Sequence, residues 1–219
     1  MTDLLLANNI NKSFNLGVQK IDVLQDVSLT IQEGEFVAIM GKSGSGKSTL
    51  ISIFAGLDIP DTGSIVLNGN ELTTLNEDQL ASKRQSDISF VFQSFHLIPT
   101  LTVAENIGFP LKILRNFNQK HVDELLQKVE LTHRANSFPH QLSGGEKQRT
   151  AIARALISQP KILFADEPTG NLDEKNANSV MDLLINLQKE FNTALVIVTH
   201  DPAIAKLANR TIHIIDGQI

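Results

Sequence analysis

Residues 36–54 read FVAIMGKSGSGKSTLISIF: an apolar run, a glycine-rich loop and a second apolar stretch in direct succession. The first run, 36–40, is apolar throughout rather than at alternate positions, which is typical of a strand covered on both faces of a parallel sheet. The apolar residues at 50, 51, 53 and 54 suit a helix that packs on such a sheet. The stretch therefore predicts a strand, a tight loop and a helix, the first unit of an α/β fold.

The loop in this unit matches the pattern G-x-x-x-x-G-K-[ST]. Its glycines let backbone N–H groups converge on phosphate oxygens without a Cβ atom in the way, and the start of the next helix adds favourable partial charge. Lys47 is expected to reach the β- and γ-phosphates of a nucleotide, and Ser48 to bind Mg²⁺. The residues expected to contact the nucleotide here are Gly41, Ser43, Gly44, Ser45, Gly46, Lys47, Ser48 and Thr49.

Two further apolar runs also end in polar residues. Residues 162–165 end at Asp166, and residues 195–199 end at His200. Because ligands bind beyond the carboxyl ends of parallel strands, we expect these side chains to lie beside the glycine-rich loop. Asp166 is expected to hold Mg²⁺ with Ser48, while Glu167 is placed to orient and deprotonate an attacking water.

The remaining chain predicts two smaller parts around this core. Residues 11–31 alternate and predict a small antiparallel sheet. Residues from about 94 to 157 lack strand-like runs and contain a helical apolar stripe, with Asn118 as its cap. We therefore expect one domain over 1–219: an α/β fold with a mostly parallel, RecA-like phosphate-loop sheet, an N-terminal antiparallel β subdomain and an inserted α-helical subdomain. The stripe consists of Val122, Leu125, Leu126 and Val129.

The composition excludes several classes of protein. A net charge of −5 and a pI near 5.7 give no general attraction to nucleic acid. The absence of cysteine excludes disulfides, cysteine zinc sites and thiol nucleophiles, and the six histidines show no H-x-x-x-H spacing. No apolar run approaches the roughly 18–20 residues of a membrane helix, so any work at a membrane requires a partner.

Residues 142–148, LSGGEKQ, begin a helix with a capping box, because Ser143 and Glu146 are three apart. Two adjacent glycines in the first helical turn cost about 1 kcal/mol each in helix propensity. We attribute them to close approach of the backbone to a ligand. The segment resembles the signature motif of ABC-transporter ATPases.

Four other positions extend this resemblance over most of the chain. Gln93 resembles the Q-loop glutamine, which links the metal and the attacking water to the permease contact. His200 resembles the switch histidine that touches the γ-phosphate. Residues 170–173 (GNLD) resemble the D-loop, which communicates between the two domains across a dimer interface. Phe14 takes the place of an aromatic residue, commonly tyrosine, that stacks on adenine.

The resemblance implies an ATPase that works as a homodimer or with a paired ATPase domain. ATP bound to the phosphate loop of one domain is then covered by the signature segment of the other, and closure drives a separate membrane permease. The implied location is cytoplasmic, on the inner face of the membrane through the permease, with no nucleic-acid partner. The implied nucleotide contacts beyond the loop are Phe14, Ser143, Gly144, Gly145 and Asp173. The implied metal ligands are Ser48, Gln93 and Asp166. The implied catalytic residues are Glu167, His200, Gln93 and Lys47.

A finer resemblance concerns the type of motor. Residues 166–173 (DEPTGNLD) look like those of LolD-, MacB- and FtsE-type ATPases, and residues 92–101 are most like YbbA-type members. This implies mechanotransmission or export of lipoproteins, lipids or drugs, with a regulatory FtsE-like signalling motor as the alternative. Because the ATPase residues contact ATP rather than cargo, cargo and direction stay open. Permease helices are expected around Phe95, Leu97, Ile98 and Leu101, unless these side chains pack internally.

Overall fold

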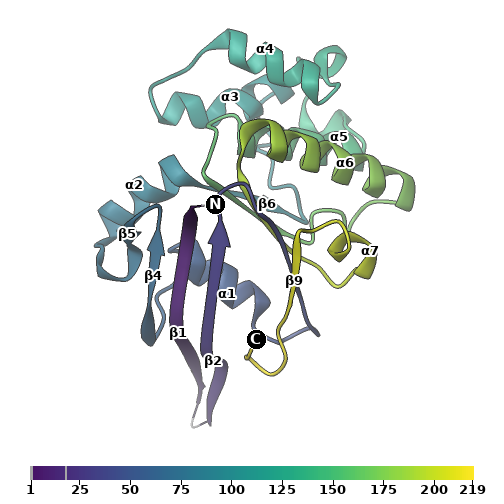
Figure 1. Ribbon diagram of the computed structural model, residues 1–219. Coiled ribbons are helices and arrows are strands. Elements are labelled where there is room, and N and C mark those ends of the chain that lie inside the picture. The colour runs from purple at the N-terminus through teal and green to yellow at the C-terminus, as the bar shows by residue number, and fades with distance from the viewer. Residues whose placement is uncertain (1, 18) are drawn as a thin grey trace.

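The computed structural model describes residues 2–17 and 19–219, which form two sheets and the helices around them (Figure 1). The larger sheet has the strand order β6-β7-β8-β3-β9, and every pair of neighbours in it is parallel. This arrangement confirms the parallel core predicted from the apolar runs. The strands are β3 (Phe36–Met40), β6 (Ile88–Phe92), β7 (Ile162–Asp166), β8 (Ala194–Val198) and β9 (Arg210–His213).

The smaller sheet is antiparallel and has the order β2-β1-β4-β5. It begins at Asp3, earlier than the predicted 11–31, because residues 4–7 (LLLA) are apolar without the alternation from which that sheet was predicted. Leu4 and Leu5 are buried where this sheet meets the core. The strands are β1 (Asp3–Leu16), β2 (Gln19–Gln32), β4 (Thr62–Leu67) and β5 (Asn70–Glu71).

Alternate residues of the parallel strands face two separate apolar cores. Val37 and Ile39 of β3 belong to the core shared with the antiparallel sheet and α1, whereas Phe36 belongs to the core shared with α3, α5 and α6. Both faces of the strand are therefore covered, which explains its continuous apolar sequence. The helices are α1 (Lys47–Phe54), α2 (Glu77–Asp87), α3 (Val103–Ile113), α4 (Gln119–Lys128), α5 (Gly144–Leu156), α6 (Glu174–Phe191) and α7 (Pro202–Ala205).

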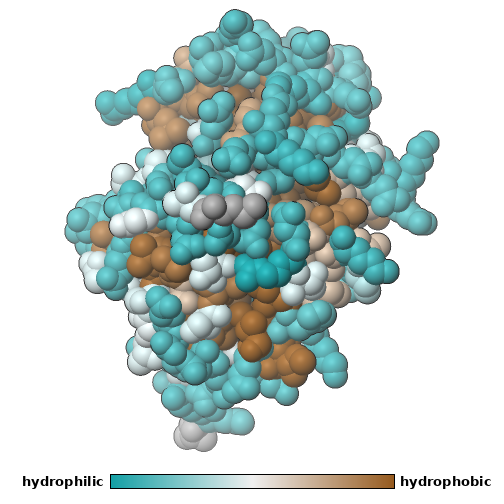
Figure 2. All heavy atoms as spheres, viewed as in Figure 1, coloured by the Kyte–Doolittle hydropathy of each residue, from teal (hydrophilic) through white to brown (hydrophobic). Residues whose placement is uncertain are grey.

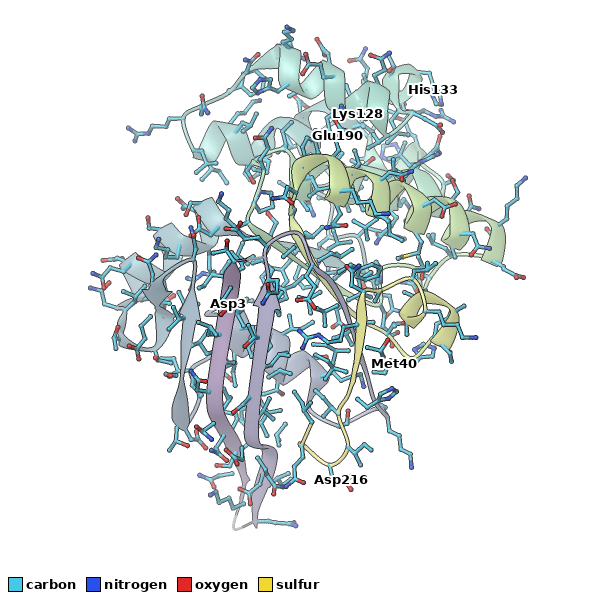
Figure 3. All side chains as sticks on the ribbon, in the orientation of Figure 1. Asp3, Met40, Lys128, His133, Glu190 and Asp216 are labelled. Carbon is cyan, nitrogen blue, oxygen red and sulfur yellow. The ribbon has the colours of Figure 1, made fainter. Side chains whose placement is uncertain are left out.

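The helices α3, α4 and α5 lie between β6 and β7 in the chain and gather at one end of the molecule, away from β1 and β2 (Figure 1). The side chain of Asn118 accepts a hydrogen bond from the backbone N–H of Lys120, so it caps α4 as predicted, and the apolar stripe of that helix is buried. Lys128 at the end of α4 forms an ion pair with Glu190 of α6 (Figure 3).

The surface is mostly hydrophilic, with apolar residues gathered near the C-terminus (Figure 2). Ile215 and Ile219 in this region are more than half exposed. None of the described helices is both long enough and apolar enough to cross a membrane.

Phe164 in the centre of β7 is fully buried, and its ring centre lies 5.5 Å from that of Phe90. We expect Phe164→Ala to lower the free energy of unfolding by about 3–5 kcal/mol, because it leaves a cavity that the sheet cannot fill. Urea unfolding measures this change. Phe138→Ala, at a residue 38% exposed, is the control and should cost less than about 1 kcal/mol; equal losses for the two variants would contradict the central place of Phe164.

Candidate nucleotide-binding site

The glycine-rich loop joins β3 to α1 and leaves the start of that helix open. Gly46 is the N-cap of α1, has φ +96°, and provides no side chain to cap the helix. A Cβ atom at Gly46 would lie 2.7 Å from the carbonyl oxygen of Val23, so only glycine fits. The first N–H groups of α1 are therefore available to an anion, and the helix dipole favours one there.

Lys47 holds the loop in shape from inside. Its side-chain Nζ donates hydrogen bonds to the carbonyl oxygens of Gly41, at 2.9 Å, and Lys42, at 2.7 Å, although the residue is only 9% exposed. The cation thus lies within the loop itself, near the open helix start. Both features favour the negative charge of a phosphate.

A cavity of about 670 Å³ brings most of the predicted site residues together. Twelve of them line it: Phe14, Gly41, Ser43, Gly44, Gly46, Lys47, Ser48, Thr49, Gln93, Asp166, Glu167 and His200. Three residues that the sequence did not single out, Val23, Lys42 and Val198, line it as well. A valine within a strand carries no functional signal, so its place in the cavity follows only from the fold.

Asp166 faces the first residues of α1 from the end of β7. The hydroxyl of Ser48 donates a 3.4 Å hydrogen bond to Oδ2 of Asp166. Burial, and secondly the neighbouring negative charge of Glu167, raise the pKa of Asp166. A cation bound beside Asp166 would be attracted by the carboxylate. It would also favour the ionised form of Asp166 over the protonated form.

The donor set here fits Mg²⁺, which prefers oxygen ligands and is usually bound through one or two carboxylates plus phosphates and waters. Ser48, Asp166 and the amide of Gln93 provide such oxygens around the cavity. In the described part of the chain, no group of three or more His, Cys, Asp or Glu side chains could hold a metal alone. Nucleotide phosphates would have to supply the remaining ligands.

Glu167 has an unfavourable backbone conformation, with φ +45°. Its N–H donates to the carbonyl oxygen of Val198 at 3.0 Å, which fixes this conformation at the edge of the sheet. Its carboxylate Oε1 lies 2.7 Å from Nδ1 of His200. Strain of this kind costs about 1–3 kcal/mol and concentrates at functional sites, where it positions a side chain.

Gln93 follows β6 and is held by a residue whose role the sequence did not reveal. The side-chain N–H of Asn171 donates to the backbone oxygen of Gln93 at 3.0 Å. A Cβ atom at Gly170 would lie 2.6 Å from Nε2 of Gln93, so a larger residue there would displace the Gln93 side chain. The GNLD segment at 170–173 is therefore bound to Gln93 within the same chain.

Phe14 lies at the rim of the cavity and is 43% exposed, which leaves its ring open to a stacking partner. The ammonium group of Lys12 lies 5.2 Å from the ring centre and is itself fixed by Asp58 Oδ1 and the carbonyl of Ile59. A cation over an aromatic ring contributes a favourable electrostatic interaction that orients the ring.

Ser45, another residue of the glycine-rich loop expected to contact the nucleotide, does not line this cavity. Its hydroxyl is buried beside Gly41 without a hydrogen-bond partner among the described atoms. Ser45 instead lines a neighbouring cavity of about 550 Å³, next to β3 and the chain after β9. The reason is the turn of the loop, in which the Ser45 N–H donates to the carbonyl of Lys42 and directs the side chain inward.

Ser143, Gly144, Gly145 and Asp173, whose implied nucleotide contacts lie across an interface between two ATPase domains, do not line this cavity of their own chain. Ser143 and Asp173 are the N-caps of α5 and α6, and Ser143 forms the predicted capping box with Glu146. A Cβ atom on Gly144 would lie 3.1 Å from Leu172 Cδ2, and one on Gly145 would lie 3.0 Å from Asn176 Oδ1. The glycines thus have a packing reason within the chain, besides the predicted approach to a ligand.

The apolar residues expected to receive a permease, Phe95, Leu97, Ile98 and Leu101, are only partly exposed. Leu97 packs against the core shared by α3, α5 and α6. Internal packing, the alternative interpretation, therefore accounts for this leucine.

Comparison with known proteins identifies the family. The model of the ABC transporter family matches residues 24–170. The chain belongs to the ABC transporter family. It is 44% identical to the uncharacterized ABC transporter ATP-binding protein YvrO of Bacillus subtilis, over 99% of this chain and 95% of YvrO. It is also 44% identical to the lipoprotein-releasing system ATP-binding protein LolD of Acinetobacter baylyi, over 97% of this chain and 95% of LolD.

Solved structures confirm the α/β phosphate-loop fold of this ABC transporter ATPase. The chain matches the ATP-binding cassette MJ0796 in a dimeric post-hydrolysis state bound to ADP and Pi, with a TM-score of 0.88 and 41% identity. The match covers 99% of this chain and 96% of that one. A dimeric structure of MJ0796, described as a bacterial ABC transporter cassette, gives the same values.

The raised pKa of Asp166 makes the stability of the free chain depend on pH. The folded state binds this proton more tightly than the unfolded state, so the resulting stability is present at low pH and is lost as the pH rises through the raised pKa. We therefore expect Asp166→Asn to raise the free energy of unfolding at pH 7 without nucleotide or metal, and the gain to vanish below about pH 4. Urea unfolding between about pH 3 and pH 8 checks this; a variant less stable than wild type at pH 7 would contradict it.

Proposed function

We propose that this chain is the ATP-hydrolysing subunit of a membrane transporter and acts as one domain over 1–219. The observation that carries the proposal is the single cavity in which the phosphate loop, Asp166, Glu167, Gln93 and His200 meet. Phe14 at its rim would stack on adenine, and Lys47 and the N-terminus of α1 would bind the phosphates. Ser48, Asp166 and Gln93 would hold Mg²⁺, which supplies neutralisation of charge on the β- and γ-phosphates.

The catalytic step follows from the geometry of Glu167. Its carboxylate accepts a proton from water, whose oxygen attacks the γ-phosphorus while the bond to the β,γ-bridging oxygen breaks. ADP and inorganic phosphate leave, and the proton passes to solvent. His200, 2.7 Å from Glu167, holds the base in place and would reach the γ-phosphate.

The nucleotide site of one chain would be completed by residues of a second copy. Ser143, Gly144 and Gly145 lie at the start of α5 outside the cavity, and Asp173 lies at the start of α6. The Ser143 oxygen already accepts from the Glu146 N–H, so its own hydrogen is free to bind a γ-phosphate across an interface. ATP would then bridge two copies, as the dimeric state of MJ0796 supports.

Closure and opening of this dimer would drive a separate membrane permease, with this chain on the cytoplasmic face. The name of the LolD relative, a lipoprotein-releasing system component, supports a motor of mechanotransmission or export type. Its cargo class would be lipoprotein, lipid or drug. A regulatory, FtsE-like motor without transported substrate would use the same residues, and stimulation of turnover by cargo separates the two.

Glu167→Gln is expected to abolish turnover while keeping ATP binding, because the amide cannot accept the proton from water. The rate should fall about 10²–10⁴-fold, and Mg-ATP should convert the chain to a stable dimer detectable by light scattering. Phosphate release and calorimetry measure turnover and binding.

Lys47→Ala is the matched control for this experiment. It removes the cation from the loop, so it should weaken nucleotide binding itself and form no ATP-dependent dimer. Full turnover in Glu167→Gln, or unchanged ATP affinity in Lys47→Ala, would contradict the assigned roles.

The permease partner is tested by capture from membranes. The tagged Glu167→Gln chain, with Mg-ATP, should recover one membrane protein with a large extracytoplasmic domain from detergent-solubilised native membranes, as identified by mass spectrometry. Lys47→Ala should recover much less if closure strengthens the contact. Recovery of soluble proteins alone would place the ATPase outside transport.

A further inference from the structure

Arg154, in the last turn of α5, binds the chain that follows Gln93. Its Nη1 donates to the carbonyl oxygen of His96 at 2.7 Å, and its Nη2 donates to that of Phe95 at 3.1 Å. Both carbonyls thus converge on one planar guanidinium, whose fork can bind two acceptors at once.

The backbone of the segment is shaped for this contact. Phe95 and His96 are consecutive non-glycine residues with positive φ, +60° and +46°. Such a pair is unfavourable unless other contacts fix it. Burial lowers the pKa of the Arg154 guanidinium, and no carboxylate among the described residues opposes this. The guanidinium is thus held by backbone carbonyl oxygens and not by an ion pair. We take this to mean that the hydrogen bonds to Phe95 and His96 are what position Arg154.

A second anchor holds the other end of the same segment. Asn106 of α3 is fully buried; its side chain accepts from the Ile98 N–H at 2.8 Å and donates to the carbonyls of Ile98 and Leu101. Asn106 of α3 and Arg154 of α5 both belong to the helices inserted between β6 and β7, and these two helices pack on each other. The segment 94–101 is therefore part of the helical insertion.

The two ends of this arrangement are the residues that the proposed function uses. Gln93 starts the segment and lines the nucleotide cavity, whereas Ser143 is the N-cap of α5. Arg154 lies 11 residues along the same helix, about 16 Å at the α-helical rise. A helix of this length transmits a displacement of one end to the other, because its hydrogen bonds and packing resist bending.

We propose that Arg154 is a positioning residue that fixes segment 94–101 to α5, so that Gln93 and Ser143 are displaced together. The inference rests on the proposed function for the roles of these two residues, but the attachment itself concerns the free chain. A partner that moves the segment would thereby move the signature helix, which must approach the second copy's ATP.

Hydrogen exchange in the nucleotide-free chain tests the attachment. In Arg154→Met, amide exchange across residues 94–101 should rise about tenfold, since the turn at Phe95 and His96 loses its charged donor. Arg154→Lys, which keeps the charge but loses the fork, should give a smaller rise. Arg149→Met is the control: Arg149 lies on the same helix but donates to Glu130, at 3.3 Å, and should leave the segment unchanged.

Steady-state kinetics test the positioning role, which a merely structural contact would not show. In Arg154→Met, kcat should fall about fivefold or more, while KM for ATP stays within about twofold because Phe14 and the phosphate loop are untouched. Arg154→Lys should restore part of kcat, which also guards against a folding defect in the methionine variant.

Two results would overturn the proposal: unchanged exchange in residues 94–101, or faster exchange with wild-type kcat. A wild-type chain without ATPase activity would instead contradict the proposed function. The amide hydrogen-exchange measurement on residues 94–101 would still test whether Arg154 fixes this segment.

Discussion

The hydrogen bonds that β8 makes on both of its sides determine the geometry of the site. Val198 pairs with Ile39 of β3 on one side and with Asp166 of β7 on the other. Because neighbouring strands lie about 4.8 Å apart, the glycine-rich loop, the acidic pair and His200 leave the sheet within about 10 Å of one another. A shift of one residue in either pairing would exchange the inward and outward faces of a strand and separate these groups.

The site contains several unfavourable features that the two apolar cores offset. Glu167 has a positive φ, Asp166 is a partly buried carboxylate beside a second one, and α1 begins without a side-chain cap. Each feature is relieved by a bound nucleotide with its metal, since phosphates cap the helix and a cation neutralises the acidic pair. The cores therefore maintain a site whose lowest free energy is reached only with ligand.

What the sequence predicted well was local. The loop between β3 and α1, the cap at Asn118 and the capping box at Ser143 each depend on residues a few positions apart, and the structure has all three. The features that the sequence did not reveal depend on contacts between distant residues. The packing of Gly145 against Asn176 leaves no trace in nearby residues, and the hydrogen bond from Asn171 to Gln93 spans 78 positions.

The contacts of Lys47 with its own loop have a consequence for the speed of the reaction cycle. With two carbonyl oxygens as partners, the ammonium group is already stripped of most water and already placed before any phosphate arrives. An incoming phosphate exchanges one set of oxygen acceptors for a stronger one, so little reorganisation is needed on entry. When the phosphate product leaves, the ammonium group again donates hydrogen bonds to the two carbonyl oxygens. Release therefore leaves no unpaired positive charge in the loop.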